Sequence, residues 1–436
     1  MTTFLRLKTN VTRLKQIYYS KGVKKTMAKK NVLGAFSFEK DFADSMKFLK
    51  TLSPKPKDTK VTLKAENGVL TVTFSWFALS ARRLFTLGDS ACFNFSVRLE
   101  DFIDIFEKFS VGTITVFDGF FRFKGNGRKM LRYFVCDMMD YRFPSFEGHK
   151  FIALPPDVFK FAALTSFATS ESERGSRVSL IIGENKVYVC SSNGYRAVTV
   201  DAPIEFAGST REYLLDPKLI ESLAKLHKKN EETEVFIAST NTQDFIKVGD
   251  YEICSGRFEV ESVAKAVKET IENLSSTPSL KVTFSPKDVT EYAEETVLIR
   301  EFSGKREPLV LGFDRENGLL MAGHKTGKGD FTGVFAAEFE GDVSSDFCIG
   351  FNPEYLRDAV KRLSEPTATL ELKDGLKASL ICEERDNLLI THLVLPVRIH
   401  EGYTITPYDD EKGGDTESVN IAAVTARVVE NEDDIF

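Results

Sequence analysis

The chain has 436 residues, more than one ordinary domain holds, and this length predicts two to four domains. Hydrophobic residues make up 42% of the chain and charged residues 28%, the usual balance of a soluble globular protein, and 37 Phe against one Trp predict that Phe fills the core. No apolar run reaches the roughly 20 residues that span a bilayer and no secretory signal stands at the start, so we expect a cytoplasmic protein without a membrane partner.

Charge is distributed unevenly, although the formal net charge is only -6. Residues 1–30 form a basic N-terminal arm with nine Lys or Arg and no acid, whereas residues 401–436 carry ten acids and two bases. Met27 is a second possible start, so the first 26 residues are a flexible arm, a mis-set start or, less favoured, a transit peptide. Net acidity alone argues against a nucleic-acid partner, but the location of the cations matters more than their sum.

One pattern recurs six times along the chain: a strand-like run, a capping residue, and a helix with a narrow apolar stripe. The copies begin near Ser37, Ser96, Ala153, Leu214, Phe284 and Phe351. Three of the helices open with a cap followed by Pro, because the cap oxygen accepts an otherwise unpaired N–H and Pro has no N–H to leave unpaired. These three starts are Asp216-Pro217, Ser285-Pro286 and Asn352-Pro353.

Two copies share the same core stripe at positions i, i+1, i+4 and i+7: Phe102, Ile103, Phe106 and Phe109 in one, and Leu219, Ile220, Leu223 and Leu226 in the other. Between the helices the apolar residues alternate with the period of a strand, and a turn interrupts each run at its centre. The clearest of these predicted antiparallel hairpins are residues 60–74, 179–192 and 369–381.

A unit of one helix and a few strands cannot bury its own apolar stripe, so neighbouring units are expected to pair over shared cores. Six half-repeats then give three α+β domains, which we place at residues 31–147, 148–276 and 277–399. An acidic, flexible C-terminal tail, residues 400–436, follows them. The alternative is that six helices of any kind would yield six caps, but the hairpins recur in step with the helices.

The sequence offers no catalytic constellation. Five His residues lie far apart, and six Cys occur singly without a CxxC pair, as expected for reduced thiols. The nearest approach to a phosphate loop, residues 323–329, is one residue short and lacks the Ser or Thr after Lys. We therefore predict no enzyme activity, no catalytic residue, no metal and no cofactor.

Four segments carry a family resemblance. Residues 192–197 (SNGYRA), followed by Pro203-Ile204, resemble the Thr-Asp-Gly-His-Arg-Leu segment and Pro-Ile of the bacterial DNA polymerase III beta subunit, the sliding clamp. Residues 350–356 (GFNPEYL) are similar to that family's Gly-Phe-Asn-x-x-Tyr-Leu, and residues 395–399 (LPVRI) to its closing Met-Pro-Met-Arg-Leu. A weaker match is residues 141–146 (YRFPSF).

The resemblance runs from about residue 35 to residue 399. Tyr195 and Ala197 depart from the family pattern and both ends of the chain are extra, which suggests a divergent and possibly phage-encoded member. The resemblance implies three tandem clamp domains that assemble into a head-to-tail ring of two chains, with helices lining the hole. It also implies that the protein acts in a bacterial cell or a phage-infected host. The implied function is a processivity factor that encircles double-stranded DNA without reading its sequence and binds a DNA polymerase and a clamp loader.

Two other functions remain open. One is a DNA-binding replication accessory protein that never closes a ring, and the other is a purely structural interaction protein. Mass in solution separates both from a ring, and salt-dependent DNA binding separates them from each other.

A clamp should offer cations to phosphates and leave the bases unread. The candidates lie on the predicted helices and in the loop before residue 179: Lys47, Lys50, Arg174, Arg177, Lys218, Lys225, Lys229, Arg357 and Lys361. Taken singly, such cations are more often merely solvated; the ring would turn them toward the hole.

The resemblance also implies a partner-peptide groove between the second and third domains, with apolar walls and a few polar groups. Carried over by motif, it consists of Leu180, Ser192, Gly194, Tyr195, Arg196, Ala197, Tyr355, Leu393, Leu395, Pro396, Val397, Arg398 and Ile399. The alternative is that residues 393–399 are simply the last buried strand.

For the contact between chains, the resemblance implies strand pairing and apolar contact at Phe121, Phe123, Val297 and Leu298. The tail ends in Asp433, Asp434, Ile435 and Phe436, which resembles the acidic, Phe-terminated tip of bacterial single-stranded DNA-binding proteins. This tip is either a partner-binding peptide or the end of a solubilising tail, and the sequence does not separate the two.

Overall fold

The computed structural model describes residues 32–53, 55, 57–87, 91–125, 130–135, 141–155, 157–169, 177–206, 208–229, 234–257, 262–276, 278–299, 307–341, 348–399, 403 and 405. None of the helices in these ranges is both long and apolar enough to cross a membrane.

All six predicted repeat helices are present. They are α2 (Lys40–Leu52), α3 (Leu99–Lys108), α4 (Asp157–Ala163), α5 (Pro217–Lys229), α7 (Pro286–Glu295) and α8 (Pro353–Val360). At two of the three helix starts that contain Pro, the residue before the Pro caps the helix as predicted. The Asp216 Oδ1 accepts from the N–H of Lys218 at 2.8 Å, and the Asn352 Oδ1 accepts from the N–H of Glu354 at 3.0 Å. At the third, the Ser285 side chain makes no capping hydrogen bond, so Pro286 sets that start without it.

Every repeat consists of one strand, its helix and three further strands. The first domain contains β1 (Val32–Phe38), β2 (Lys60–Glu66), β3 (Val69–Trp76), β4 (Leu79–Thr86), β5 (Phe93–Arg98), β6 (Gly112–Phe117), β7 (Phe120–Gly125) and β8 (Met130–Phe134). The second contains β9 (Ile152–Leu154), β10 (Val178–Gly183), β11 (Lys186–Ser192), β12 (Arg196–Pro203), β13 (Arg211–Leu215), β14 (Val235–Ser239), β15 (Gln243–Val248) and β16 (Tyr251–Gly256). The third contains β17 (Leu280–Phe284), β18 (Leu309–Asp314), β19 (Leu319–Thr326), β20 (Gly329–Gly341), β21 (Cys348–Phe351), β22 (Ala368–Leu372), β23 (Ser379–Arg385) and β24 (Leu388–Val394).

The predicted hairpins form at the predicted turns. β2 and β3 are joined through Asn67 (φ 53°) and Gly68 (φ 76°), and β10 and β11 through a turn in which Asn185 has φ 55°. Asn and Gly adopt this left-handed conformation at the lowest cost, which is why they stand there. In the third hairpin the Asp374 carboxylate accepts from the N–H groups of Leu376 and Lys377, both at 2.9 Å.

The two repeats of a domain are tied together by their first strands. β1 pairs with β6 and β5 pairs with β2, so each opening strand joins the sheet of the other repeat. The same exchange links β9 with β14, β13 with β10, β17 with β22 and β21 with β18. Neither repeat of a pair is therefore complete alone, as the repeat pattern predicted.

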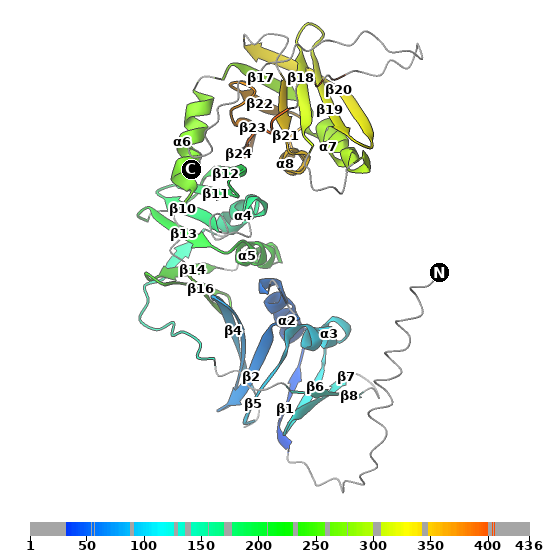
Figure 1. Cartoon of the computed structure of the whole chain (residues 1–436). Helices are drawn as coiled ribbons and strands as arrows, with labels where there is room; N and C mark the ends of the chain where they lie inside the picture. Colours follow the sequence, from blue (N-terminus) through cyan, green and yellow to red (C-terminus); the bar gives the residue numbers. More distant parts are fainter. Residues whose placement is uncertain are drawn as a thin grey trace, which may run out of the picture.

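The sheets also continue across the domain boundaries. β4 pairs with β16 and joins the first domain to the second in an eight-stranded sheet, while β12 pairs with β24 and joins the second domain to the third in a twelve-stranded sheet. The chain therefore forms one arc, with the sheets outside and the six repeat helices along the inner, concave edge (Figure 1). We keep the divisions near residues 147 and 276 as a proposal; they fall in the connections before β9 and β17.

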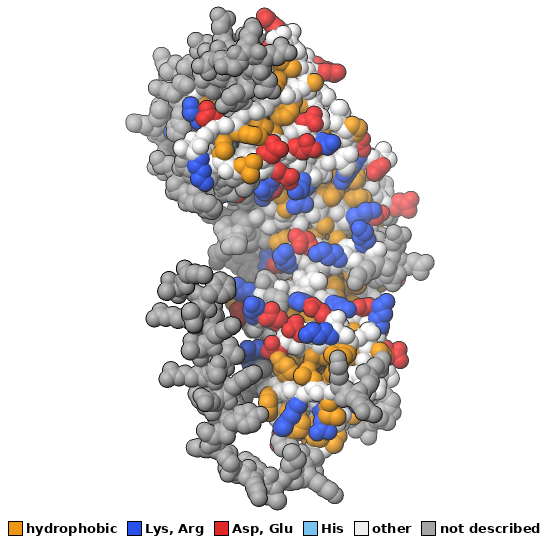
Figure 2. Space-filling view, turned by 90° about the vertical axis from the view of Figure 1, so that its right-hand side faces the viewer, with side chains coloured by type: hydrophobic (Ala, Val, Ile, Leu, Met, Phe, Trp, Pro, Cys, Tyr) orange, Lys and Arg blue, Asp and Glu red, His pale blue; other side chains and the backbone are white. Residues whose placement is uncertain are grey.

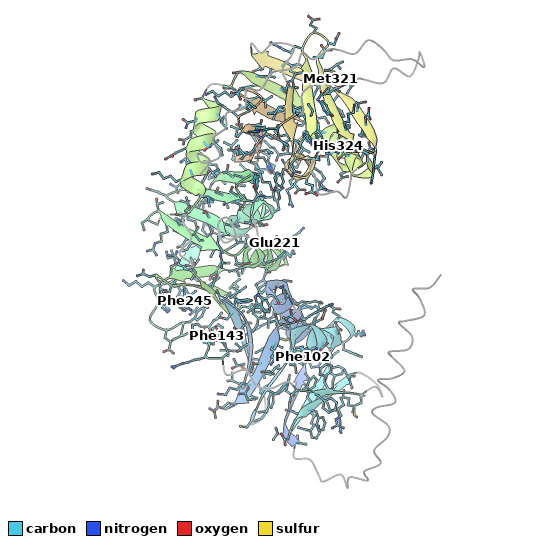
Figure 3. The ribbon with its side chains drawn as sticks, viewed as in Figure 1. Phe102, Phe143, Glu221, Phe245, Met321 and His324 are labelled. Atoms are coloured by element: carbon cyan, nitrogen blue, oxygen red, sulfur yellow. The ribbon has the colours of Figure 1, made fainter. Side chains whose placement is uncertain are left out.

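Phe fills the core of the first domain as predicted. Phe102 of α3 is fully buried and packs edge-on against Phe106, with ring centroids 4.8 Å apart (Figure 3). Phe38 and Phe42 complete this aromatic layer between the helices and the sheet. A smaller cluster around Phe146 and Phe245 lies at the boundary with the second domain.

Two features differ from the expectations. A seventh helix, α6 (Ala264–Ser275), lies on the convex side of the arc, apart from the six repeat helices (Figure 1). The packed part of the third domain also extends past residue 399, because Ile405 is buried against Val310 and Met321. Gly323 makes room for this extension, since a Cβ there would lie 3.0 Å from the Ile405 Cγ1. Ile405 therefore departs from the expected flexible tail at residues 400–436, and residues 406–436 lie outside the described ranges.

Five of the six cysteines are described, and all five are free thiols. Cys92 is exposed, Cys190 and Cys254 are buried, and Cys348 and Cys382 are half-buried. Cys136 lies outside the described ranges.

Candidate nucleic-acid interface

The six repeat helices pack in pairs along the concave face: α2 with α3, α4 with α5, and α7 with α8. Across the first domain boundary α2 also contacts α5. Each helix turns its apolar stripe toward the sheets, so its polar side chains point into the open side of the arc. Figure 2, viewed from this side, shows Lys and Arg interspersed with Asp and Glu across the middle of the face.

The positive charge of this face is concentrated in the centre of the arc. α5 carries four Lys and one Glu, and α2 carries three Lys and two Asp. By contrast, α3 and α7 each carry one Lys and four acids. Because these two helices also lie on the concave face, that face carries acids as well as cations.

Most of the predicted cations are held in exposed ion pairs. The Nζ of Lys47 is 3.5 Å from Asp44, that of Lys50 is 2.8 Å from Glu107, and that of Lys218 is 3.1 Å from Glu221 (Figure 3 labels Glu221). Arg357 pairs with the adjacent Asp358 at 2.8 Å, and Lys361 pairs with Glu294. Lys50 holds the pKa of Glu107 below its usual range, as Lys361 does for Glu294. Exposed pairs of this kind contribute little stability, so a DNA phosphate can replace the carboxylate partner.

Two Lys residues of α5, Lys225 and Lys228, stand apart from the paired cations. Both are exposed, and no ion pair to either is formed within the described ranges. Lys228 was missed by the sequence analysis, although it continues the i, i+3 spacing from Lys225. Lys229, which was predicted, belongs to the same helix, but its side chain is not described.

The side chain of Arg177 is largely buried, so it does not form part of the exposed concave face. Its side chain is only 11% exposed and pairs at 3.4 Å with Asp216, the residue that caps α5, and burial lowers the pKa of the guanidinium. Its role is therefore to position the helix start. Arg174 lies outside the described residues.

The residues predicted for the partner groove separate into three places. Leu180 is fully buried in the core, beneath the sheet surface. Tyr195, 64% exposed, stands at a turn beside Gly194, where the Ser192 Oγ accepts from the N–H of Gly194 at 3.1 Å. The last segment passes this turn: the Leu395 N–H donates to the Tyr195 carbonyl at 3.0 Å, and the Val397 N–H to the Gly350 carbonyl at 2.8 Å. In this segment Pro396 and Ile399 are half-buried and Arg398 is exposed.

Arg196 ties the second domain to the third on the helix side. Its guanidinium donates to the Asp358 carboxylate at 2.8 Å and to the Phe167 carbonyl at 2.9 Å, and it stacks over the Tyr355 ring at 4.6 Å. The Tyr355 hydroxyl in turn accepts from the Asn193 side chain at 3.3 Å. The Arg196 guanidinium is therefore occupied by contacts within the chain.

Three apolar members of the predicted groove lie on the other side of the same sheet. Ala197, Leu393 and Leu395 belong to one apolar cluster with Leu380, and α6 packs over this cluster. Sequence analysis missed this helix because no strand-cap pattern precedes it. Its stripe of Val267, Ile271 and Leu274, at i, i+4 and i+7, was the available signal.

Two of the predicted contacts between chains are corrected. Phe121 and Phe123 point into the core of the first domain, and at 0% and 1% exposed they leave no apolar surface for a second chain. Leu298, in contrast, is 79% exposed just after α7, and the side chain of Val297 is not described.

One strand further on, β8 exposes three apolar side chains: Met130, Leu131 and Phe134. Beside them is a groove of about 510 Å³ lined by α3 and β8. Its apolar walls are Ile105, Phe109, Phe123, Met130, Leu131 and Tyr133, and Asp101, Asp104 and Lys108 stand at its side. At the other end of the arc Val334 of β20 is 43% exposed.

Within the described residues, no cluster of three or more His, Cys, Asp or Glu has the arrangement of a metal site. The concave face carries charged side chains of both signs, with Lys predominating on α5 and α2.

Known proteins share this architecture. Residues 281–398 match the family model described as DNA polymerase III beta subunit, C-terminal domain. The chain is similar in structure to the DNA polymerase III beta subunit of Thermotoga maritima (TM-score 0.71, 14% identity, covering 84% of this chain and 100% of that one). It is similar to the beta subunit of Pseudomonas aeruginosa (0.69, 17%, 84% and 100%) and to the polymerase sliding clamp of Bacillus subtilis (0.68, 18%, 84% and 99%). No curated protein matches in sequence. The predicted resemblance and the three-domain clamp fold are thus confirmed, at low identity.

Proposed function

We propose that this chain is a DNA sliding clamp, a non-catalytic processivity factor that encircles duplex DNA and tethers a DNA polymerase to it. The observation that carries the proposal is the arc itself, with helices inside, continuous sheets outside and a strand with a free edge at each end. By analogy with the proteins that share its fold, it acts in the cytoplasm of a bacterial cell or a phage-infected host.

Ring closure follows from how the two internal junctions are built. At each, the last strand of a domain's first repeat (β4 or β12) pairs antiparallel with the last strand of the next domain's second repeat (β16 or β24). One strand of each kind remains: β20 in the third domain and β8 in the first. Within the described ranges, β8 pairs only with β7, and residues 329–336 of β20 pair only with β19. The same rule applied between chains pairs β20 of one with β8 of the other and closes a head-to-tail ring.

Side chains at the two ends support this pairing. Leu298 is exposed in the 3-10 turn Thr296–Ile299, which contacts β20, and the groove on the first domain offers apolar walls from Ile105, Phe109, Met130 and Leu131. Inserting an exposed Leu into such a groove removes apolar surface from water on both chains. We therefore propose Leu298, Met130 and Leu131 as the apolar contact, in place of Phe121 and Phe123.

Mass in solution tests the ring directly. Sedimentation velocity at micromolar concentration is expected to give a single species of about twice the chain mass of 49.0 kDa. A monomer at that concentration would favour the alternative, a DNA-binding replication accessory protein that does not close a ring.

Contact with DNA is proposed to run through α5 and α2, without base recognition. Reversing Lys225 and Lys228 to Glu is expected to weaken duplex binding at least about tenfold and to reduce the slope of log K against log salt by about 0.9 per lost phosphate contact. Filter binding across a salt series measures both quantities. Lys64→Glu with Lys265→Glu makes the same charge change on β2 and α6, outside the concave face, and should leave binding nearly unchanged; equal losses in both variants would refute a localised interface.

The remaining partners are proposals from the shared fold. They are the polymerase and a clamp loader, bound through peptide segments with apolar anchors near the junction of the second and third domains. The acidic tip with Asp433, Asp434, Ile435 and Phe436 is a further candidate ligand for such a site, on this chain or on another replication protein.

A further inference from the structure

The outer face of the junction between the second and third domains carries an apolar seam. Three side chains from three adjacent strands form a straight row, because Leu393 of β24 is in register with both Ala197 of β12 and Leu380 of β23. Ala378 and Leu395 extend this row. The apolar seam, defined by these five residues, crosses the line along which two domains meet.

Helix α6 covers the seam, but it is loosely held. Its stripe of Val267, Ile271 and Leu274 packs against the seam while remaining partly exposed, and Ala264 is its one fully buried residue. Along the body of the helix the ion pairs stay within it, such as Lys265 with Glu269. Its start is anchored by Ser262, whose Oγ accepts from the N–H of Ala264, donates to the Glu212 carboxylate and lies 3.3 Å from the Ser179 Oγ. Lys268 adds a contact with the strands, since its ammonium lies 5.7 Å from the centre of the Tyr188 ring.

A helix that is hydrogen-bonded to the sheet at its start and otherwise fixed mainly by partly exposed apolar contacts opens more easily than the strands beneath it, which are held by continuous ladders. The seam under α6 also contains three residues, Ala197, Leu393 and Leu395, that the family resemblance assigned to partner binding. An amphipathic segment with aliphatic side chains at i, i+4 and i+7 is therefore already seated on the surface that a partner peptide would use.

We propose that α6 is a built-in occupant of the partner site: it covers the apolar seam in the free protein, and an apolar-anchored segment of a partner binds by displacing it. This inference rests on the proposed clamp function, since it concerns how that function's partners gain access. The apparent affinity for a partner is then the intrinsic affinity multiplied by the fraction of molecules in which α6 has left the seam. Loosening α6 raises that fraction and so strengthens partner binding without any new contact.

The reactivity of the Cys382 thiol can report whether α6 covers the seam. Cys382 lies two residues from Leu380 in β23 and packs on the apolar seam, where burial raises the pKa of its thiol to about 11. Cys254, whose pKa burial also raises to about 11, belongs to β16. Opening of α6 exposes the Cys382 thiol, whereas unfolding also exposes the Cys254 thiol.

The experiment uses the full chain and two triple variants. Val267→Ser, Ile271→Ser and Leu274→Ser remove the stripe, while Lys265→Ser, Glu269→Ser and Asn273→Ser make matched changes on the exposed side of the same helix. Iodoacetamide labelling, mapped by mass spectrometry, should be at least about tenfold faster at Cys382 in the stripe variant, with Cys254 unchanged. The matched control should behave like the unsubstituted chain. If Cys382 and Cys254 accelerate together, or neither does, α6 is not a removable cover.

A peptide supplied in trans completes the test. A fluorescein-labelled copy of residues 262–276 should bind the stripe variant at least about tenfold more tightly than the unsubstituted chain, and the same peptide with its three stripe residues changed to Ser should bind neither. Equal binding to both chains, or none to either, overturns the proposal. Dimer formation and retention on DNA are measured on the same samples: if the unsubstituted chain fails those, the clamp function falls while the thiol and peptide results still report on α6.

Discussion

Once it surrounds a linear duplex whose ends are both blocked, the protein is expected to survive washing in about 1 M NaCl, because a closed ring is held by topology rather than by ion pairs. The duplex is fixed to a bead at one end and carries biotin at the other. Incubation at high protein concentration lets dimers exchange and close around the DNA, and streptavidin then caps the free end. Protein remaining after the wash is measured, and cleavage of the duplex between bead and cap should release it.

A closed ring and a protein held by ion pairs alone should differ greatly in the amount that remains on the DNA after the wash. A protein that makes six to ten phosphate contacts loses about 10³–10⁵ in affinity between 50 and 200 mM salt, so none should remain without topological closure. The same duplex without the streptavidin cap serves as the control, since a ring slides off its open end. Equal loss from capped and open DNA would exclude encirclement and leave a non-ring DNA-binding protein.

The repeat could be predicted because its signals are local. A cap followed by Pro, as at Asp216-Pro217 and Asn352-Pro353, specifies a helix start from two adjacent residues, and an Asn-Gly turn such as Asn67-Gly68 specifies a hairpin. Helix α6 has a weaker signal: Val263, directly before it, offers no capping side chain, and Ser262, which accepts from the N–H of Ala264 at 3.2 Å, is not followed by Pro. Its amphipathic stripe was present in the sequence, but without a cap followed by Pro it did not stand out from the linker.

The site was less predictable because its properties depend on residues distant in sequence. Strand alternation gives two faces for β7, but only the fold determines that Phe121 and Phe123 face the core and that the free apolar edge is the next strand. Likewise, a Lys on a helix surface is identified from spacing, whereas its carboxylate partner is not. Lys50 meets Glu107 of another helix, and Lys361 meets Glu294 of α7. Which cations are available to DNA is therefore a property of the assembled face.

Replacing Leu298 by Asp is expected to convert the dimer to monomers at micromolar concentration. A central apolar anchor typically contributes about 2 kcal/mol or more, and burying an unpaired carboxylate in its place raises that cost. A head-to-tail ring of two chains contains two identical junctions, so a single substitution weakens both. The free energy of dimer association is therefore reduced by about 4 kcal/mol or more. The dimer dissociation constant should rise by about 10³, which sedimentation equilibrium can measure.

The other side of the same contact provides the cross-check. Leu131→Asp on β8 should dissociate the dimer as Leu298→Asp does, and the chain with both substitutions should lose less than the sum of the two, because each removes the same contact. Leu376, 67% exposed in the turn between β22 and β23, supplies the matched control: Leu376→Asp makes the same chemical change away from both ends of the arc and should leave the dimer intact. If Leu298→Asp and Leu376→Asp behave alike, β20 and β8 do not form the junction, and the rule drawn from the two internal junctions does not extend between chains.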